Sequence, residues 1–221
     1  MKTLTKCLIM LLAISMVVSC KNNTESADKA KAKPAVTATT STAGEAYKVD
    51  VATSMVRWTG NKPTGDSHQG TISITGGTVK VANGTVTGGE FMMDMGSLVS
   101  TDLKSGEGKE KLEGHLKSGD FFEVEKYPTG KFVITGAKAV SGREDATHEI
   151  TGNLTLKDKT HSITFPAHVG VVGDKVMAQT PKFMINRTTW GVSFNSGILG
   201  TAKDMLINDD VALVVTLNAT K

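Results

Sequence analysis

Hydrophobic and polar residues alternate along most of the chain from Tyr47 onward. Tyr47, Val49 and Val51 are separated by single polar residues, and similar runs recur as far as residues 211–217. Strict alternation of this kind indicates strands with one buried face. Turn signals such as Asn83-Gly84 separate the runs, and Gly76-Gly77 predicts a further hairpin turn.

About eight strands with short connections and no helical crossovers predict one domain with antiparallel up-and-down topology. Eight strands closed into a barrel enclose an interior that holds one small ligand or is filled by side chains. The fold class we expect is therefore all-β, a single antiparallel up-and-down barrel of about eight strands with one short helix. At this point the pattern leaves a filled and a hollow barrel equally open.

The stretch 112–128 interrupts the alternation. Leu112, His115 and Leu116 have the i, i+3, i+4 spacing of one helical face. Residues 118–120, Ser-Gly-Asp, then end the helix, and Phe121-Phe122 follows at once. Two adjacent aromatic residues are costly to leave in water, so we expect this segment to pack against the sheet. It serves either as a stabilising plug or as part of a cavity wall.

Residues 1–19 have the features of a secretory signal peptide. Two lysines precede an apolar run from Cys7 to Val18, interrupted only by Ser15, that is too short to span a membrane. The run ends in Val17-Val18-Ser19-Cys20, which resembles the lipobox of bacterial lipoproteins. Cys20 would otherwise be an unpaired thiol in an oxidising compartment. We predict that Cys20 is lipidated; the alternative is an ordinary secretory signal with an incidental cysteine.

Residues 20–44 are rich in Lys, Ala, Thr, Ser and Asn, and they predict a lipidated, disordered tether ahead of a barrel domain at 45–221. Removal of residues 1–19 leaves 23 basic against 22 acidic residues, because Lys2 and Lys6 leave with no acid. The mature chain is thus nearly neutral. No basic run is interleaved with aromatic residues, so a nucleic-acid partner is not expected.

The sequence offers little for catalysis. Its five histidines are scattered, and none shows the spacing of a metal-ligand pair. Nucleophile-elbow and phosphate-binding glycine motifs are missing as well. We therefore expect no enzyme activity, no metal and no catalytic cofactor. Arg57 and Arg187 are either rim charges or, at a barrel mouth, groups able to hold a pyrophosphate or a quinone oxygen.

Several motifs together resemble the YceI-like family of bacterial envelope proteins. The resemblance covers roughly residues 47–217, and the most specific part is the segment around the predicted helix. The motifs that carry it are Gly114-His115-Leu116-Lys117-Ser118, Asp120-Phe121-Phe122, Tyr127-Pro128, Trp58-Thr59-Gly60, His68-Gln69-Gly70, Gly152-Asn153-Leu154-Thr155 and Arg187 with Trp190-Gly191. Asp158 stands where this family pattern has a glycine, a difference at the level of one turn.

The resemblance implies a lipocalin-like barrel whose tunnel takes the tail of an isoprenoid lipid, such as a polyprenyl chain or a quinone. Alternation and the helix break place the candidate lipid-binding residues on inward faces: Phe91, Met93, Phe121, Phe122, Phe132, Phe165 and Trp190. We expect lipid carriage or storage in the cell envelope, anchored through Cys20 at the outer membrane and facing the periplasm.

Other interpretations remain open at this stage. One is a structural envelope lipoprotein whose barrel is filled by its own side chains. A less favoured one is a hydrolytic enzyme, which would need a polar cluster inside the barrel formed by His68 and His115. The expected partners are an isoprenoid lipid and the membrane, with a homodimer left open.

Overall fold

The computed structural model describes residues 27–37 and 44–221. The expected signal peptide, Cys20 and residues 21–26 and 38–43 of the expected tether lie outside these ranges. The strands are β1 (Asp28–Lys29), β2 (Lys33–Pro34), β3 (Glu45–Val49), β4 (Met55–Asn61), β5 (Ser67–Ala82), β6 (Thr85–Ser100), β7 (Thr129–Ala139), β8 (His148–Leu156), β9 (Lys159–Val172), β10 (Lys175–Gln179), β11 (Phe183–Asn186) and β12 (Asp210–Thr220). The helices are α1 (Lys109–Lys117) and the 3-10 turns η1 (Arg187–Trp190) and η2 (Gly197–Leu199). Within the described ranges, no helix is long and apolar enough to cross a bilayer.

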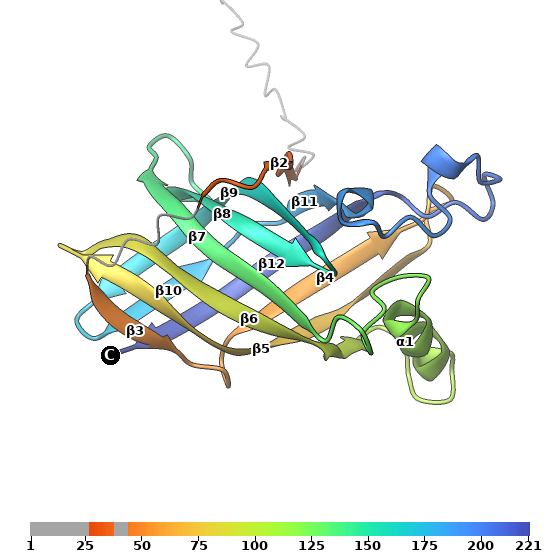
Figure 1. Ribbon diagram of the computed structural model, residues 1–221, viewed down its shortest axis with the longest axis horizontal. Coiled ribbons are helices and arrows are strands. Elements are labelled where there is room, and N and C mark those ends of the chain that lie inside the picture. Colours follow the sequence, from red (N-terminus) through yellow and green to blue (C-terminus); the bar gives the residue numbers. More distant parts are fainter. Residues whose placement is uncertain (1–26, 38–43) are drawn as a thin grey trace, which may run out of the picture.

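Eight strands close into a barrel, as the alternation predicts (Figure 1). The ring runs through β4, β5, β6, β7, β8, β9, β10 and β12, and β12 pairs with β4 to close it. Every pair in the ring is antiparallel. Strands that follow one another in the sequence are paired, and β10 pairs with β12 although β11 comes between them in the sequence. The expected all-β, lipocalin-like, up-and-down topology is confirmed.

Strand β12 is the most extensively paired strand at the point of closure. It pairs with β10 and β11, and also with β3 and β4. The β-branched and aliphatic residues of this strand suit a central position, because such side chains pack well on a pleated surface.

Two glycines mark the places where β5 and β6 approach closely. The predicted turn at Gly76-Gly77 is wrong, because β5 runs through it and turns only at Asn83-Gly84. Gly77 (φ 153°) and Gly89 (φ 139°) face the neighbouring strand, and a Cβ on either would lie 2.2–2.3 Å from a carbonyl oxygen across it. The glycines therefore permit close β5–β6 contact in a long, bent strand pair.

The segment 27–37 is part of the sheet, which differs from the disorder expected for residues 20–44. Strand β1 pairs in parallel with β11, and β2 pairs with β9. The side chain of Asn153 accepts from the Val36 amide (3.2 Å) and donates to the Val36 carbonyl (2.7 Å). Ala30 is buried in the core. Order here comes from backbone hydrogen bonds, which the small side chains of the segment do not reveal.

Candidate functional site

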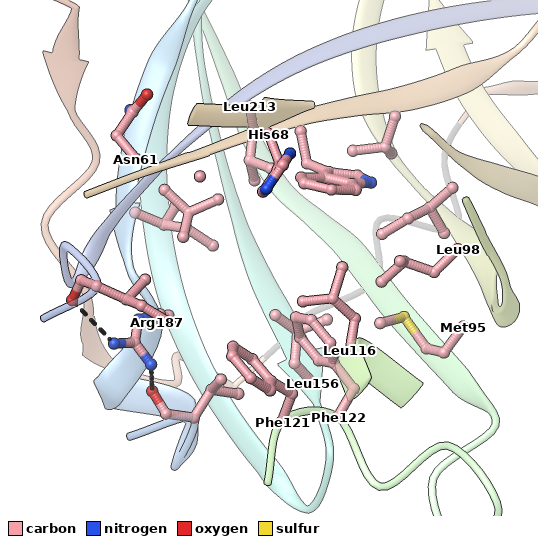
Figure 2. Close-up of a pocket in the computed structure, with 18 of the residues that line it drawn as sticks. Asn61, His68, Met95, Leu98, Leu116, Phe121, Phe122, Leu156, Arg187 and Leu213 are labelled. Carbon is pink, nitrogen blue, oxygen red and sulfur yellow. Dashed lines mark hydrogen bonds between the residues drawn. The ribbon is translucent and has the colours of Figure 1, made fainter. Parts of the chain in front are cut away.

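A cavity of about 430 Å³ occupies the half of the barrel nearest α1 (Figure 2). Phe121 and Leu116 lie across it from His68 and Leu213. Its walls are almost wholly aliphatic, aromatic or thioether side chains. They come from strands β4, β5, β6, β8, β11 and β12, from the α1 segment and from the loop 191–209: Val56, Trp58, Ile72, Met93, Met95, Leu98, Leu112, Leu116, Phe121, Phe122, Leu154, Leu156, Ile185, Val192, Ile207, Val211 and Leu213. A volume of this size is within the range of small-molecule sites.

The polar residues of the opening that solvent reaches lie on one side, whereas Arg187, the other polar residue of the wall, is buried. The β4–β5 hairpin contributes Asn61, Lys62, Asp66, Ser67 and His68, three of which are exposed. The cavity therefore combines an apolar interior with a polar rim. This distribution fits an amphiphile whose tail lies in the barrel and whose head lies near the hairpin.

Helix α1 and the residues after it form the wall opposite this rim. The predicted helical turn is present, and Leu112 and Leu116 line the cavity from one face of α1. Ser118 caps the helix through its amide and hydroxyl, both of which donate to the His115 carbonyl (3.1 and 2.8 Å). The break directs Phe121 inward, where it is buried, while Phe122 stays half-buried at the opening.

His115 orders this corner through a side-chain hydrogen bond. Its Nε2 lies 2.9 Å from Oδ2 of Asp120. The imidazole also meets Phe121 and Phe194 edge-on, with ring centroids 5.0 and 4.7 Å away. Phe121 and Phe194 are themselves 5.4 Å apart. The three rings thus join the α1 segment to the loop that follows η1.

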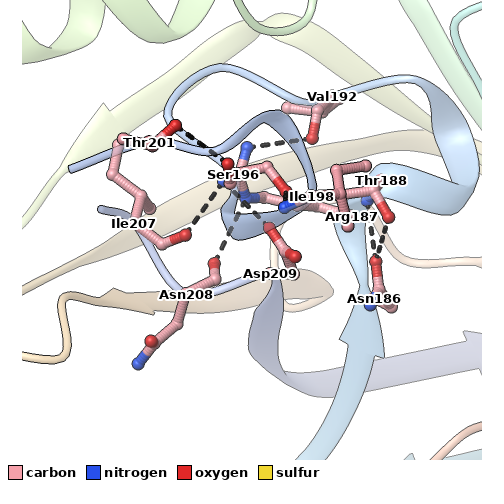
Figure 3. Close-up of polar contacts among 10 residues, drawn as sticks. All are labelled: Asn186, Arg187, Thr188, Val192, Ser196, Ile198, Thr201, Ile207, Asn208 and Asp209. Carbon is pink, nitrogen blue, oxygen red and sulfur yellow. Dashed lines mark hydrogen bonds and ion pairs between the residues drawn. The ribbon is translucent and has the colours of Figure 1, made fainter. Parts of the chain in front are cut away.

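Arg187 lies at the opening but is committed to the chain itself (Figure 3). Its guanidinium donates to the carbonyls of Asn208 (3.2 Å), Val192 (2.9 Å) and Ile207 (3.1 Å), and to Asp209 (3.3 Å). The residue is only 5% exposed, and burial lowers the pKa of the guanidinium while Asp209 opposes that effect. It is neither a free rim charge nor an available anion ligand, but the clamp of the 191–209 loop.

His68 pairs with Asp102 at the rim. Nδ1 of His68 lies 2.8 Å from Oδ2 of Asp102. Partial burial raises the pKa of Asp102, but hydrogen bonds from His68, the Gln69 amide and Ser100 outweigh it and lower the pKa to about 2. The Asp102 carboxylate is therefore ionised at neutral pH and fixes the orientation of the His68 ring.

The candidate lipid-binding residues occupy two levels of the barrel. Met93, Phe121 and Phe122 line the large cavity. Phe91, Phe132 and Phe165 line a separate void of about 50 Å³ further from α1. Trp190 is fully buried, and its indole nitrogen donates to the Leu154 carbonyl (3.0 Å) without lining either space.

Other wall residues were missed by sequence reasoning, among them Trp58, Leu154, Leu156 and Leu213. Their alternation with polar neighbours does mark them as inward-facing. What separates them from ordinary core residues is their height along the barrel. To find them from the sequence, one would need the register of each strand against its neighbours, which gives the distance of each residue from the α1 end of the barrel.

Residues 27–37 and 44–221 contain no group of three or more His, Cys, Asp or Glu side chains placed to hold a metal ion. The nearest polar pairs at the site, His68 with Asp102 and His115 with Asp120, each supply one imidazole and one carboxylate.

The chain matches the YceI-like domain over residues 47–219. A UPF0312 protein of Pseudomonas putida strain W619 is 36% identical over 104 residues, which are 46% of this chain and 52% of that protein. A UPF0312 protein of Pseudomonas aeruginosa strain PAO1 is 45% identical over 60 residues, 27% of this chain and 29% of that protein. The matched stretch spans about half the length of the first of these curated relatives, and less of the second.

Two solved structures share the fold. BcnA of Burkholderia cenocepacia has a TM-score of 0.58 and 22% identity, covering 78% of this chain and 99% of its own. A polyisoprenoid binding domain from Saccharophagus degradans, implicated in plant cell wall breakdown, has a TM-score of 0.57 and 15% identity, covering 79% of this chain and 97% of its own.

Proposed function

This chain belongs to the YceI-like family, and from that premise we propose that it is an envelope lipoprotein that binds an isoprenoid-type lipid, a polyprenyl chain or a quinone, in its barrel for carriage or storage. The observation that carries the proposal is the apolar cavity of about 430 Å³ with a polar rim on one side. A structural relative described as a polyisoprenoid binding domain supports the choice of ligand class.

The energetics of the cavity support binding of an apolar tail. Burial of a few hundred Å² of isoprenoid surface is worth on the order of 10 kcal/mol at about 25 cal/mol per Å², before the costs of association. Met93 and Met95 line the wall with flexible thioether chains, which adapt to irregular shapes. A branched, unsaturated chain suits such a wall.

The head of the lipid would lie at the β4–β5 hairpin. Lys62 and Asn61 provide hydrogen-bond donors there, and His68 provides an imidazole held by Asp102. Arg187 is excluded from this role because Asp209 and three carbonyls already use its donors.

Binding accounts for the polar groups better than hydrolysis does. The enzyme alternative needs His68 and His115 to meet inside the barrel. Instead, His68 pairs with Asp102 on the rim and His115 pairs with Asp120 beside Phe194. The structural alternative needs a filled barrel, whereas side chains leave the half nearest α1 hollow.

Lipid extraction tests the proposal. Native protein should release an isoprenoid when a solvent extract is analysed by mass spectrometry. Met93→Trp, which places a larger side chain in the cavity, should lose that lipid. Met92→Trp is the matched control, because Met92 is the next residue of β6 and points out of the barrel. Native protein that carries no lipid, or equal lipid in the two variants, would contradict the proposal.

The anchor is tested separately. Cys20→Ser should move the protein from the membrane fraction to the soluble envelope fraction, since lipidation is the proposed attachment. A Cys20→Ser protein that still fractionates entirely with membranes would refute lipidation while leaving the cavity proposal intact.

A further inference from the structure

The loop at 191–209 ends in an exposed apolar tip. Ile198 is 68% exposed, Leu199 64% and Met205 56%. These three side chains lie within the eight residues 198–205, whereas the other exposed large hydrophobic residues of the described chain occur singly or, as with Val172 and Met177, in pairs. Grouped exposure of this kind marks an interaction surface, because apolar surface is driven out of water.

Hydrogen bonds within the loop hold the tip in a defined conformation. Ser196, itself fully buried, caps η2 by accepting from the Ile198 amide (3.3 Å), and its carbonyl accepts from the Thr201 hydroxyl (2.9 Å). The Ile207 amide donates to the Asn195 carbonyl (2.9 Å) and ties the two arms of the loop together. The apolar side chains of η2, Ile198 and Leu199, are thus held in solvent.

The two ends of the same loop, here called its root, form part of the cavity opening. Arg187, Val192 and Ile207 line the cavity, and the Arg187 clamp fixes their positions. Figure 1 shows the loop projecting beyond the strands at the end of the barrel where α1 lies. A surface that receives the tip would therefore lie next to the opening.

The N-terminal segment reaches the barrel near this root. Lys29 forms an ion pair with Asp210, the first residue after the loop, and the Ala30 amide donates to the Met184 carbonyl, three residues before Arg187. From Ala27 back to Cys20 the chain spans at most about 25 Å. A lipid on Cys20 would hold the loop root near the bilayer.

The charge of the tip indicates how it would bind. Lys203 and Asp204 are both exposed and offset each other, so the segment has no excess of either sign. Attraction to anionic head groups is therefore a minor contribution, and insertion of apolar side chains is the main one. Neutral phosphatidylcholine should suffice as a surface.

We propose that Ile198, Leu199 and Met205 insert into the surface of a lipid bilayer and bring the cavity opening against it. An isoprenoid then passes between bilayer and barrel without crossing water. The transfer step rests on the proposed function, whereas insertion of the tip does not.

Tryptophan placed at the tip measures insertion directly. In the full chain, Leu199→Trp should shift its emission to shorter wavelength with phosphatidylcholine vesicles and be quenched when the acyl chains are brominated. The native Trp58 and Trp190 are buried and present in every variant, so their contribution is subtracted with the native chain as reference. Val172→Trp is the control, since Val172 is 67% exposed in the β9–β10 hairpin. Attachment through residues 1–26 affects both variants equally. Unchanged emission of Leu199→Trp, or equal quenching of both, would overturn insertion.

Transfer kinetics test the consequence. The double variant Ile198→Ser with Leu199→Ser should take up a fluorescent isoprenoid from vesicles about tenfold more slowly than the native chain, because burial of even one such side chain is worth at least that factor. Uptake of the same probe from detergent micelles should stay unchanged. Equal uptake from vesicles would overturn the transfer step. A native chain that binds the probe from neither source would refute the proposed function, and quenching would still decide insertion.

Discussion

Phe132 gives the sharpest test of how the barrel limits its ligand. The ring of Phe132 lies 5.4 Å from that of Phe91 and 5.5 Å from that of Phe165, and Phe165 stacks on Phe183 at 4.5 Å. Strand register places this aromatic layer between the two cavities. Along β6, Met93 lines the large cavity, and Phe91, two residues further from α1, lines the smaller void and pairs with Phe132 of β7. A bound tail must end at this layer.

Phe132→Ala should open the layer and join the cavity of about 430 Å³ to the void of about 50 Å³. Without lipid, the loss of a buried phenyl ring should lower the free energy of unfolding by about 3–5 kcal/mol. With lipid, one further five-carbon unit can enter, and its burial is worth about 4 kcal/mol at roughly 0.8 kcal/mol per carbon. After the cost of ordering that unit, the preference for the longer chain should rise about a hundredfold.

The assay compares lipids extracted from the native chain, Phe132→Ala and a control. Ile74→Ala is suitable as the control, because Ile74 is buried but lines neither cavity. Mass spectra report the distribution of chain lengths, and thermal melts report stability. Phe132→Ala should shift the distribution toward longer chains, whereas Ile74→Ala should lose stability with the native distribution.

An unchanged distribution in Phe132→Ala, alongside the expected loss of stability, would show that the aromatic layer is ordinary core and not a limit to the tail. Phe132 would then leave the set of candidate lipid-binding residues, together with Phe91 and Phe165.

Three further predictions concern the clamp, the rim and the N-terminal segment. Arg187→Met should lower the free energy of unfolding by about 3 kcal/mol, measured by urea denaturation, because it leaves the partly buried Asp209 carboxylate and three carbonyls without their donor. Asp102 has a folded pKa of about 2 against an ordinary value of 3.8, so its contribution to stability is present above about pH 4 and is lost as pH falls toward 2. Urea midpoints of Asp102→Asn should lack this part of the acid dependence. Asn153→Ala removes both hydrogen bonds to Val36, so hydrogen exchange of residues 28–36 should accelerate by an amount equal to about 1–2 kcal/mol while the barrel melts nearly as before.

The sequence alone predicted the barrel because the features that determine this fold are local in the chain. Alternation sets which side chains of a strand face inward, and turn residues set where strands end, so the closed up-and-down barrel follows from adjacent pairings. The failure at Gly76-Gly77 has a physical cause. Glycine is required both in tight turns and where two backbones come close, and only the pairing of Gly76 and Gly77 with Met92 and Phe91 of β6 separates the two uses.

The ordered structure of residues 27–37 could not be predicted from the composition of the segment, for a different reason. Small and charged side chains bury little surface, which is why the segment resembles a tether. Its order comes from main-chain pairing with β9 and β11 and from the amide of Asn153, a residue more than a hundred positions away. Contacts of that kind leave no trace in the segment's own sequence.

The candidate site was predicted only in part, because the sequence pattern does not give the position of a residue along the barrel axis. Period two identifies the inward face but not the height along the barrel, so Met93 and Phe132 looked equivalent although they line different cavities. Arg187 was expected at the opening and lies there, yet its partners at 192 and 207–209 come from a loop whose conformation the guanidinium itself maintains.

Beside the β4–β5 hairpin, the opening of the barrel is built by two excursions from the sheet, residues 101–128 and 187–209. They meet through the rings of His115, Phe121 and Phe194, which lie 4.7–5.4 Å apart. Each excursion is ordered internally, the first by the cap at Ser118 and the second by Arg187. Separation of the three rings would widen the opening and break no strand pairing, since the contact between the two excursions is side chain to side chain. A barrel that must admit a long tail and then retain it needs this division between a rigid sheet and a separable rim.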